Sequence, residues 1–481
     1  MYKKSKMTLP KKRGRKPKIK LSATAAKAMG TTVKKLDTPD SLRGFKDILP
    51  LEEHYWKFIR EKVSRLAKDY NFKMIETPVL ENSALFKRGL GKYTDIVEKE
   101  MFQFVDKGGK DVVLRPEGTA GVARSYINHG MHNLPQPLKV FYDGPMFRYE
   151  KPQSGRLREH HQIGFEVIGS ENPATDAQLI LIGHNLLEDL GISFNLQINS
   201  VGCAGCRGVF KEALVEYYRS VRKELCDNCK RRLNRNSLRL LDCKEDSCHG
   251  VKEAAPQIVD FLDDHCKKHF MQVLEYLDEL EISYNLNPFL VRGLDYYTKT
   301  VFEFWPSGEK KAQSALFGGG RYDDLIEELG GQETPGAGFS AGIERLILRI
   351  KDEGVIIPTL PRLEVFVAQL GVEAKKRSML LFEELRKKGF GVVENFAKDS
   401  LKQQLEDANK LKVRFVLILG QKELQEKTIL LRDMDAGVQE IIDQKKIIPI
   451  LRSKLEAVKV MVEEKSEEPS LEKDAKDKKG K

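Results

Sequence analysis

The chain has 481 residues, of which 41% are hydrophobic, 8% aromatic and 32% charged, and its formal net charge at pH 7 is +11. This length and composition are ordinary for a globular protein of roughly two to four domains. No apolar run approaches the length needed to cross a bilayer, and no apolar leader lies near the N-terminus. We therefore expect a cytoplasmic protein with no membrane partner.

The positive charge is concentrated at one end of the chain. Residues 1–20 contain ten lysines and arginines and no acid, and the rest of the chain carries a net charge of about +1. The segment KKRGRKPKIK at residues 11–20 resembles the minor-groove arm called an AT-hook, which gains affinity by releasing counterions from phosphates. One expectation is a nucleic-acid contact through residues 1–20. The other is a solvated, disordered arm and linker over residues 1–38.

The first folded elements are expected after residue 39. Apolar residues at helical spacing predict a helix over residues 51–70, and a strand over residues 72–78 should follow and end at Pro78. The sequence LRPEGT at residues 114–119 predicts a compact turn, with a short helix beginning near Thr119.

Residues 141–169 are unusually dense in polar side chains. The flanks Val140–Phe147 and Ile163–Ile168 have the composition of strands, and residues 151–158 between them form a basic loop. The predicted antiparallel hairpin carries its charged and amide groups at Arg148, Glu150, Gln162 and Glu166. So many polar groups on facing strands indicate a polar pocket.

All seven cysteines fall within residues 195–281. Two CxxC pairs separated by nineteen residues, Cys203/Cys206 and Cys226/Cys229, fit the spacing of a four-thiolate zinc site in a small stiffened insertion. A second ligand set pairs Cys226/Cys229 with Cys243/Cys248 or with His249. Reduced thiols without a metal are the remaining alternative.

A second polar segment is Phe289–Phe304, FLVRGLDYYTKTVFEF. Residues 300–304 alternate as a half-buried strand does, whereas the earlier residues crowd an arginine, a glycine, an aspartate and two tyrosines together. An arginine in such a segment can grip an anionic phosphate or carboxylate, and paired tyrosines offer flat walls with hydroxyl groups. The segment therefore indicates a binding site for a small molecule.

Two glycine-rich segments follow. FGGGRYDDL at residues 317–325 allows a small molecule to approach the backbone closely. GAGFSAGIERL at residues 336–346 predicts a strand leading into a helix that carries Arg345 in its first turns, where backbone amides favour an anion. Neither segment has the glycine spacing of a dinucleotide-binding fold or a Walker loop.

The last part of the chain has a different pattern. After a linker at residues 353–361, strands and helices alternate over residues 362–452 and predict a separate α/β domain with a mixed sheet. Residues 453–481 form a charged tail. Within it we expect disorder over residues 463–481, where acids and lysines leave almost nothing apolar.

Five of these segments resemble signatures of one enzyme class. The unit ending at Pro78, the segment FRYEKPQSGRLREHHQIGFEVIG at residues 147–169 and the segment GAGFSAGIERL resemble motifs 1, 2 and 3 of the class II aminoacyl-tRNA synthetases. LVRGLDYYTKTVFEF and FGGGRYDDL resemble the two histidine-specific signatures of the histidyl-tRNA synthetase family. The resemblance runs over roughly residues 40–450, in the order in which the family has these segments.

The resemblance implies an α+β fold in which an antiparallel sheet is flanked by helices. It divides the chain into a catalytic core at residues 39–194 and 282–352, a cysteine-rich insertion domain at residues 195–281 and a C-terminal α/β anticodon-binding domain at residues 362–452. The family works as a homodimer.

The implied activity is that of an ATP-dependent histidine–tRNA ligase, whose substrates are L-histidine, ATP with Mg²⁺ and histidine tRNA. The carboxylate of histidine would attack the α-phosphate of ATP to give histidyl-adenylate, and the histidyl group would then pass to the terminal ribose of the tRNA. The alternative is a catalytically inert, histidine-binding regulatory subunit of ATP phosphoribosyltransferase. That subunit tends to lack the C-terminal domain and the insertion, and to lose the ATP-binding arginines.

The resemblance also implies roles for single residues. The catalytic residues would be Arg148, at the α-phosphate, and Arg292, which would stabilise charge where other members of the class use a metal ion. The ATP-binding residues would be Arg148, Glu150, Arg156, Phe165 and Arg345, with Phe165 stacking on the adenine and Arg345 holding the γ-phosphate. The histidine-binding residues would be Glu117, Gly118, Thr119, Arg148, Gln162, Glu166, Arg292, Tyr296 and Tyr297. Among these, Glu117, Thr119 and Gln162 would hold the ammonium group, and Glu166 and Tyr297 would contact the ring.

Overall fold

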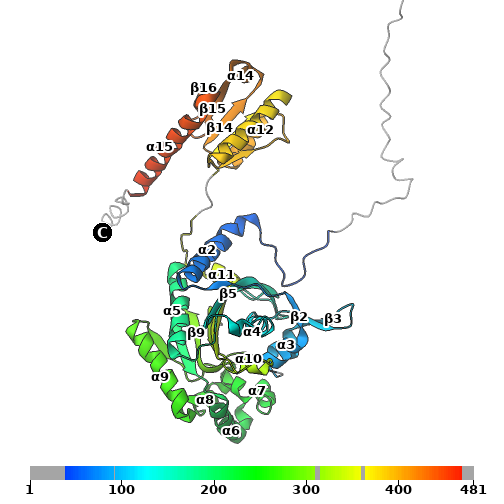
Figure 1. Ribbon diagram of the computed structural model, residues 1–481, viewed down its shortest axis with the longest axis vertical. Helices are drawn as coiled ribbons and strands as arrows, with labels where there is room; N and C mark the ends of the chain where they lie inside the picture. The colour runs from blue at the N-terminus through cyan, green and yellow to red at the C-terminus, as the bar shows by residue number, and fades with distance from the viewer. Residues whose placement is uncertain (1–37, 92, 309–314, 359–362, 468–481) are drawn as a thin grey trace, which may run out of the picture.

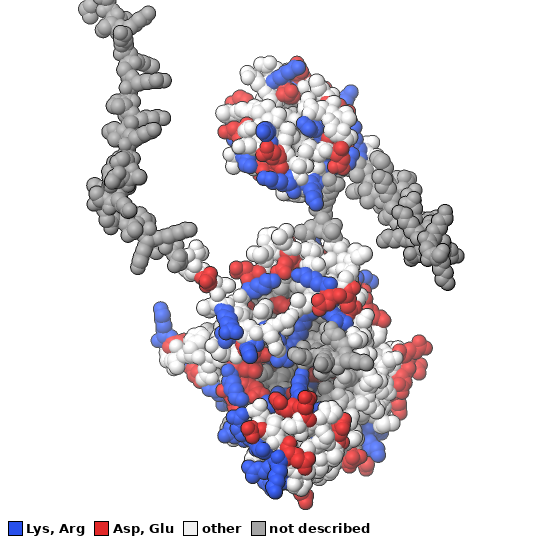
Figure 2. All heavy atoms as spheres, turned by 180° about the vertical axis from the view of Figure 1, so that it is seen from behind, with Lys and Arg blue, Asp and Glu red and all other residues white. Residues whose placement is uncertain are grey.

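The computed structural model describes residues 38–91, 93–308, 315–358 and 363–467 and, for residues 458–467, the backbone alone. The chain forms a larger body up to residue 358 and a smaller one from residue 363 (Figure 1). The basic arm predicted at residues 1–20 lies outside the described residues. On the face shown in Figure 2, acidic and basic side chains are interspersed over both bodies, as the small net charge outside that arm predicts.

An eight-stranded sheet forms the centre of the larger body. Its strand order is β1-β5-β6-β11-β10-β9-β7-β8, and neighbours are antiparallel except at the two edges. The strands are β1 (Lys73–Met74), β5 (Leu138–Phe147), β6 (Glu159–Ile168), β7 (Phe194–Ser200), β8 (Tyr284–Leu286), β9 (Thr298–Pro306), β10 (Phe317–Arg321) and β11 (Gly336–Gly342). The antiparallel sheet and the predicted hairpin are confirmed, whereas the strand expected over residues 72–78 is shortened to β1.

Helices cover both faces of this sheet. One face packs against α2 (Glu53–Asp69), α5 (Pro173–Asp189), α9 (Asp264–Glu279) and α11 (Ile343–Asp352) in a large apolar core. The other face packs against α3 (Ser83–Gly89), α4 (Thr119–Asn128) and α10 (Leu325–Glu328) in a second core. Figure 1 shows the curved sheet wrapped around α4, which begins at Thr119 as predicted.

Alternation along β6 separates these two layers. Ile163, Phe165 and Val167 enter the core of the first face, because every second side chain of a strand points to the same side. Glu166, between Phe165 and Val167, points to the other face and accepts a hydrogen bond from Thr119 at the start of α4. A small sheet of β2 (Leu80–Asn82), β4 (Asp111–Leu114) and β3 (Phe102–Val105) lies next to α3.

A buried ion pair joins the sheet to α5. Arg321, at the end of β10, is fully buried and donates to the carboxylate of Asp176 through both Nε and Nη2. Asp176 also accepts hydrogen bonds from Thr300 on β9 and interacts with His269 of α9 at 2.7 Å. The arginine of the FGGGRYDDL segment is therefore a structural residue, and it fixes the strand that ends beside the polar pocket.

The cysteine-rich part is smaller than the expected insertion of residues 195–281. Strand β7 belongs to the main sheet, and the apolar face of α9 packs in the main core. The separate core of the insertion involves α6 (Ala204–Ser220), α7 (Asp227–Arg232) and α8 (His249–Glu253). Cysteine content alone placed the expected boundaries too far apart, because Cys203 and Cys266 lie where the insertion joins the sheet and α9.

The smaller body has the predicted mixed sheet, in the order β13-β12-β14-β15-β16. Strands β12, β13 and β14 are parallel, and β15 and β16 are antiparallel. Its elements are β12 (Val365–Gln369), α12 (Val372–Lys387), β13 (Val392–Glu394), α13 (Leu401–Lys410), β14 (Phe415–Leu419), α14 (Gln421–Glu426), β15 (Thr428–Asp433), β16 (Gln439–Asp443) and α15 (Ile447–Glu467).

Helix α15 differs from the expectation for the tail. It continues through residue 453, and Leu455 packs in the core of the smaller body, because its apolar face has β-strands to cover. The disorder expected over residues 463–481 is wrong for residues 463–467, which are helical, and residues 468–481 lie outside the described part. None of the helices in the described residues is long and apolar enough to cross a membrane.

Candidate active site

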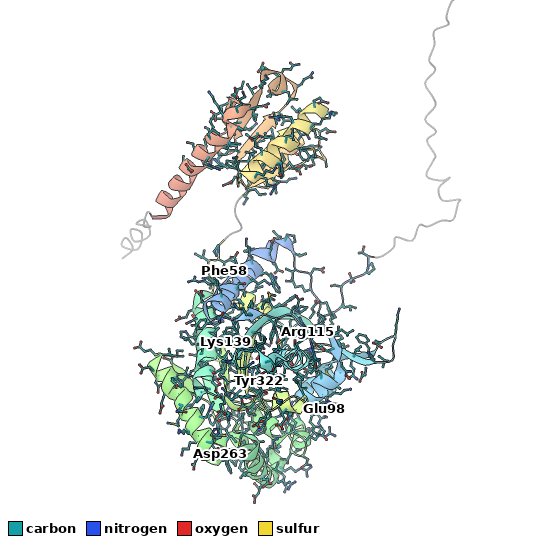
Figure 3. The ribbon with its side chains drawn as sticks, in the orientation of Figure 1. Phe58, Glu98, Arg115, Lys139, Asp263 and Tyr322 are labelled. Carbon is teal, nitrogen blue, oxygen red and sulfur yellow. The ribbon has the colours of Figure 1, made fainter. Side chains whose placement is uncertain are left out.

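The polar residues of β6 run along the face of the sheet that looks toward α4. His160, Gln162, Gly164 and Glu166 share one face and alternate with His161, Ile163 and Phe165, and they pair with β5 on one side while β11 extends the sheet on the other. Figure 3 places Tyr322, which bonds to Glu166, and Arg115 in the middle of this body. The candidate site extends from Glu166 at one end of the strand to His160 at the other.

The end near Glu166 is a buried network of carboxylates and hydroxyls. Oε1 of Glu166 accepts from the hydroxyl of Thr119 at 2.7 Å, and Oε2 accepts from the hydroxyl of Tyr322 at 2.6 Å. The carboxylate of Glu117 accepts from the backbone N–H groups of Thr119 and Ala120 at 2.8 and 2.9 Å, at the start of α4. The structure thus brings Glu117, Thr119 and Glu166 together, and the sequence missed Tyr322 as a member of this group.

Both carboxyl groups have perturbed acidity. Burial raises the pKa of Glu166 from 4.5 to about 8, against the hydrogen bonds from Tyr322 and Thr119, which lower it. Burial also raises the pKa of Glu117. A carboxyl with no water around it resists ionisation until a cation or a donor compensates. The pair is therefore suited to a ligand that brings positive charge and N–H donors.

Tyrosine rings line the same end. Tyr296 and Tyr297 are buried with ring centroids 4.7 Å apart, and the Tyr296 hydroxyl lies 3.4 Å from Oε2 of Glu117. Tyr142, on β5, is buried and its hydroxyl has no hydrogen-bond partner among the described residues. Burial, with the nearby Glu166 and Glu117, holds the pKa of Tyr142 well above its usual value. A free buried hydroxyl on a pocket wall is available to a ligand.

The glycines of β10 and β11 make room for these groups. A Cβ at Gly338 would lie on the carboxylate of Glu166, and a Cβ at Gly318 would lie 2.9 Å from Nη1 of Arg292. Gly318 would also clash with the carbonyl of Phe302 across the sheet. Along the run Gly318–Gly320 the nearest atoms to an added Cβ are backbone carbonyls of the neighbouring strands, so these glycines permit close packing within the sheet. The approach of a small molecule to this backbone stays a prediction.

Arg292 lies beside the tyrosines. Its guanidinium pairs with Glu303 of β9 and lies 5.4 Å from the centroid of the Tyr297 ring. Burial disfavours the charged guanidinium, but Tyr297 and Glu303 outweigh burial and raise the pKa of Arg292. Its Nε is buried without a partner among the described residues. Glu303 and Tyr297 thus hold the Arg292 side chain in place, while its Nε–H stays available to a ligand.

The other end of the site is cationic. Nε of Arg148 donates to the carbonyl of Pro116 at 2.8 Å, which leaves the rest of the guanidinium near Glu150. Arg156 lies 3.3 Å from the same glutamate. Three ATP-binding candidates of the predicted hairpin, Arg148, Glu150 and Arg156, are therefore neighbours.

Arg345 completes this cationic end from α11. It donates to the carbonyls of Ala315 and Gly155 at 2.7 and 3.3 Å, so that helix and hairpin loop are tied together. Burial lowers the pKa of Arg345 to about 10, with a further contribution from the like charges of Arg156 and Arg148. Arginines that weaken one another's charge in this way favour an anion between them.

His160 is a site residue that the sequence did not single out. Burial, followed by the charges of Arg148 and Arg345, lowers its pKa to about 3, so that the imidazole is neutral. Its Nδ1 is buried without a hydrogen-bond partner among the described residues. The parity of β6 could have indicated it, because His160 is two residues from Gln162 and shares its face.

The position of Phe165 contradicts the expected stacking on adenine. Phe165 is 0% exposed and stacks on Phe339 at 5.3 Å and on Phe141 at 5.9 Å in the core under α2 and α5. It neighbours Glu166 in the chain, so the two side chains point to opposite faces of the sheet. Phe165 is a core residue, and the flat ring available on the site face of β6 is that of His160.

Gln162 and Gly118 lie where the sequence predicts. Gln162 is 9% exposed on the site face of β6, between His160 and Glu166, and its Oε1 has no partner among the described residues. Gly118 precedes α4, and a Cβ there would lie inside the ring of Tyr142. Arg115, a further residue of this turn, anchors it by donating to the carbonyls of Pro145 and Thr77 at 2.9 and 2.7 Å.

The cysteines form two clusters, and the expected joint site of Cys203, Cys206, Cys226 and Cys229 is wrong. The first cluster consists of Cys226, Cys229, Cys243 and Cys248, and the second consists of Cys203, Cys206, Asp263 and Cys266. The two CxxC pairs separate because one begins α7 inside the insertion and the other begins α6 at its base. The first cluster is the second ligand set of the sequence analysis, with Cys248 in place of His249, which is exposed and lies 3.5 Å from Glu253.

Comparisons with known proteins point to one family over most of the chain. Residues 44–346 match the family model of histidyl-tRNA synthetase, and residues 364–454 match that of the anticodon binding domain. The histidine–tRNA ligase of Desulforamulus reducens is 42% identical over 413 residues, which cover 86% of this chain and 98% of that protein. The one from Thermosipho melanesiensis is 46% identical over 412 residues, covering 85% and 98%.

Solved structures agree with this result. The apo histidyl-tRNA synthetase of S. aureus superimposes with a TM-score of 0.72 at 36% identity, covering 86% of this chain and all of that one. A histidyl-tRNA synthetase from Nostoc shares the fold at 22% identity, with a TM-score of 0.60. With both family models matched in order and with relatives above 40% identity over nearly their whole length, this chain belongs to the histidyl-tRNA synthetase family.

Proposed function

We propose that this protein attaches histidine to its tRNA in an ATP-dependent reaction, and that the surface along β6 is the active site. The observation that carries the proposal is the division of this one strand. Its Glu166 end offers buried carboxylates and hydroxyls, and its His160 end offers three arginines. The first suits an amino acid with an ammonium group and an imidazole, and the second suits the phosphates of a nucleotide.

Histidine is expected at the Glu166 end. Glu117, with its raised pKa, compensates the ammonium group, and Thr119 and Gln162 add polar contacts to it. Glu166 and Tyr297 contact the imidazole nitrogens from the sheet and from the tyrosine wall. If an apolar amino acid were bound, the buried polar groups of the site would have no hydrogen-bond partner. Such a site therefore rejects apolar amino acids strongly.

ATP, as its magnesium complex, is expected at the arginine end. Arg345 and Arg156 hold the outer phosphates, and Arg148 and Arg292 hold the α-phosphate next to the carboxylate of histidine. Glu150 accepts from the adenine amino group, and His160, neutral and flat, covers the base. The support for this arrangement is that the guanidiniums lie close enough to add to the effect of burial, which lowers the pKa of Arg345 and of His160.

The reaction then needs alignment and positive charge, because both reacting groups come from the substrates. An oxygen of the histidine carboxylate forms a bond to the α-phosphorus while the bond between that phosphorus and the bridging oxygen breaks, and pyrophosphate leaves. Arg148 and Arg292 stabilise the charge on the phosphoryl oxygens. In the second step a ribose hydroxyl of the tRNA attacks the acyl carbon, and AMP leaves.

The regulatory alternative is less well supported. An inert regulatory subunit has no use for a complete set of ATP-binding arginines, and Arg148, Arg292 and Arg345 are all present at the site. The match of residues 364–454 to an anticodon binding domain also favours a protein that handles tRNA. We further propose that the protein acts in the cytoplasm, where its tRNA and ATP are available.

We propose a structural zinc ion at Cys226, Cys229, Cys243 and Cys248. Cys229 and Cys248 are buried and the other two are half-buried. The four ligand atoms lie within 4.8 Å of one another, and the sulfurs of Cys226 and Cys243 are 3.9 Å apart. That spacing fits two thiolates on one tetrahedral ion, whose edge is about 3.8 Å for bonds of about 2.3 Å. The ion would hold together an insertion with few regular elements of its own.

A homodimer is proposed from the apolar surface around β1 and the small sheet. Met74, Leu80, Phe104 and Val105 are between 43% and 67% exposed on the edge of the larger body. Exposed apolar side chains gathered at one edge mark a protein contact surface. Residues 1–20, with their positive charge, are proposed as an additional contact with nucleic acid, and deleting them should weaken binding of tRNA or of a DNA duplex.

The function is tested by exchange of labelled pyrophosphate into ATP with each of the twenty amino acids in turn. Exchange that depends on histidine alone establishes the first step, and formation of an acid-precipitable histidyl-tRNA establishes the second. An absence of exchange with all amino acids, in protein that still binds histidine, would favour the regulatory alternative. Sedimentation analysis of the same preparation determines whether two chains associate.

A further inference from the structure

A second group of metal-ligating side chains lies at the base of the insertion. The sulfurs of Cys203, Cys206 and Cys266 and the carboxylate of Asp263 all lie within 4.8 Å of one another. We propose that these four residues bind a zinc ion of their own, separate from the one at the Cys226 cluster. The CxxC spacing predicts a metal site for Cys203 and Cys206, but with Cys226 and Cys229 as partners; the structure replaces these with Asp263 and Cys266.

The distances suit a tetrahedral ion. The sulfurs of Cys203 and Cys206 lie 3.6 Å apart, and Oδ2 of Asp263 lies 3.3 and 3.2 Å from them. Zinc bonds of about 2.3 Å to sulfur and about 2.0 Å to oxygen give edges of about 3.8 Å between two sulfurs and about 3.5 Å between sulfur and oxygen. The observed edges are within a few tenths of these values, so small shifts of the side chains complete the site.

A disulfide accounts for the cluster less well. A bonded pair of sulfurs lies about 2.05 Å apart. A disulfide between Cys203 and Cys206 would also leave unexplained why the thiol of Cys266 and the carboxylate of Asp263 lie beside them. Without a metal, the protonated thiols of Cys203 and Cys206 both donate to Oδ2 of Asp263, and a divalent cation would displace these protons and bind the same atoms. Three sulfurs and one carboxylate oxygen are therefore better explained as the ligands of a divalent cation.

The backbone holds the ligands in place. The N–H of Asp263 donates to the sulfur of Cys206 at 3.2 Å, and the N–H of Cys266 donates to Oδ1 of Asp263 at 2.7 Å, which leaves Oδ2 for the ion. Gly202 has a φ of +64°, and a Cβ there would lie 2.6 Å from the Cβ of Cys206, so a side chain would disturb the cluster. Cys206 and Cys266 are buried and Asp263 is exposed, so the ion enters from the solvent side.

The position of the cluster gives the ion a specific task. Cys203 and Cys206 lie where the chain enters the insertion at the start of α6, and Asp263 and Cys266 lie where it leaves at the start of α9. Figure 3 shows Asp263 at this junction, beside α9. Helix α9 packs in the core of the main sheet. An ion bound by residues at the starts of both α6 and α9 would therefore link the insertion to the larger body.

This junction is continuous with the proposed histidine pocket. Arg207, one residue beyond the CxxC pair, donates to the carbonyls of Asp295 and Tyr297 at 3.0 and 2.7 Å. The N–H of Lys299 donates to the carbonyl of Gly202 at 2.9 Å. Fixing the start of α6 therefore fixes the backbone of the tyrosine wall, and the ion acts as a positioning element for the histidine site.

Metal content is the first test. Full-length protein, purified under reducing conditions without chelator, should contain one zinc for each cluster by elemental analysis. The variant C203S/C266S should lose half of that zinc, and the matched control C226S/C243S should lose the other half. Reconstitution with Co²⁺ should give C226S/C243S a sulfur-to-cobalt absorbance about three-quarters that of C203S/C266S, because three thiolates remain in place of four.

The proposal is overturned if C203S/C266S keeps the zinc content of the wild-type protein, or if intact-mass analysis finds Cys203 joined to Cys206. Should C203S/C266S fail to fold, the wild-type count decides, because a single zinc per chain contradicts two sites. The milder variant D263N should fold and release half of its zinc to a chelator faster than wild type. In pyrophosphate exchange it should raise the KM for histidine several-fold and leave the KM for ATP unchanged.

Discussion

Replacing Glu166 by glutamine perturbs the histidine pocket at its most strongly shifted carboxyl group. The amide keeps the size of the side chain but removes the negative charge, and because its nitrogen can only donate, one of the hydroxyls of Thr119 and Tyr322 must change from donor to acceptor. A hydrogen bond to a charged group contributes about 1.5–3 kcal/mol, so kcat/KM for histidine should fall roughly 10- to 150-fold. Pyrophosphate exchange measures this loss, and the KM for ATP should stay as it is, because the proposed ATP site lies at the other end of β6.

The same variant changes the pH dependence of stability. Because the pKa of Glu166 is raised from 4.5 to about 8, the folded protein binds this proton more tightly than the unfolded chain does. Stability contributed by the neutral carboxyl is therefore complete below about pH 4.5 and is lost as the pH rises toward 8, by at most about 5 kcal/mol. E166Q does not titrate, so its free energy of unfolding should fall less between those pH values.

Urea unfolding of the ligand-free protein at about pH 5 and about pH 8 measures this difference. The matched control is Glu279→Gln, at an exposed position on α9, which should behave as wild type in both assays. Glu117 also has a raised pKa, so some loss with pH remains in E166Q. An E166Q protein with wild-type kcat/KM for histidine and an unchanged pH dependence would refute the assignment of Glu166 to the pocket.

Three further predictions separate the roles of neighbouring residues, and a fourth concerns the metal. Phe165→Ala should cost about 3–5 kcal/mol of unfolding free energy in urea titrations and leave the KM for ATP near wild type, because its ring fills the core. His160→Ala, on the opposite face of the strand, should instead raise the KM for ATP with little loss of stability. Arg345→Gln should lower kcat/KM for ATP in pyrophosphate exchange roughly a hundredfold, the usual effect of losing one charge contact with the transition state. Cys243→Ser should release one of the zinc ions, as elemental analysis would show, and should lower the melting temperature of the protein.

Local sequence patterns predicted most of the helices and strands, because the spacing of apolar residues within a short segment indicates the type of element. The hairpin, the helix beginning at Thr119 and the mixed C-terminal sheet all lie close to their predicted bounds. The end of α15 was not predictable in this way. Its last turns are charged, and they are helical because the preceding turns pack Leu455 against a sheet.

Phe165 shows an error that the sequence itself could have prevented. Gln162 and Glu166 were both expected in the pocket, and they differ by an even number of positions in a predicted strand. Phe165 differs from each by an odd number, so it must face the other way unless a bulge intervenes. The register between β5 and β6 is continuous here, and strand geometry outweighs the motif resemblance.

The cysteines show the opposite case, because no local pattern could have decided which of them share a metal site. Spacing favoured a site shared by the two CxxC pairs, but Cys206 has its partner Asp263 at a distance of 57 residues along the chain. Tyr322 similarly reaches Glu166 across 156 residues. Such contacts depend on how the insertion folds back and on the order of the strands. The sequence near the residues concerned indicates neither.

The site contains buried ionisable groups whose charged forms are not fully compensated by other groups of the protein. Among the described residues, neither Glu117 nor Glu166 has a cationic partner within salt-bridge distance, and burial raises the pKa of both. At the other end, burial first and then the like charge of Arg156 lower the pKa of Arg345, which the nearby Glu150 only partly offsets. Burial of carboxyl groups at one end of the strand and of a guanidinium at the other costs stability in the free protein. The proposed ligand pair would compensate both ends, because it brings an ammonium and an imidazole to the carboxyl end and phosphates to the arginine end.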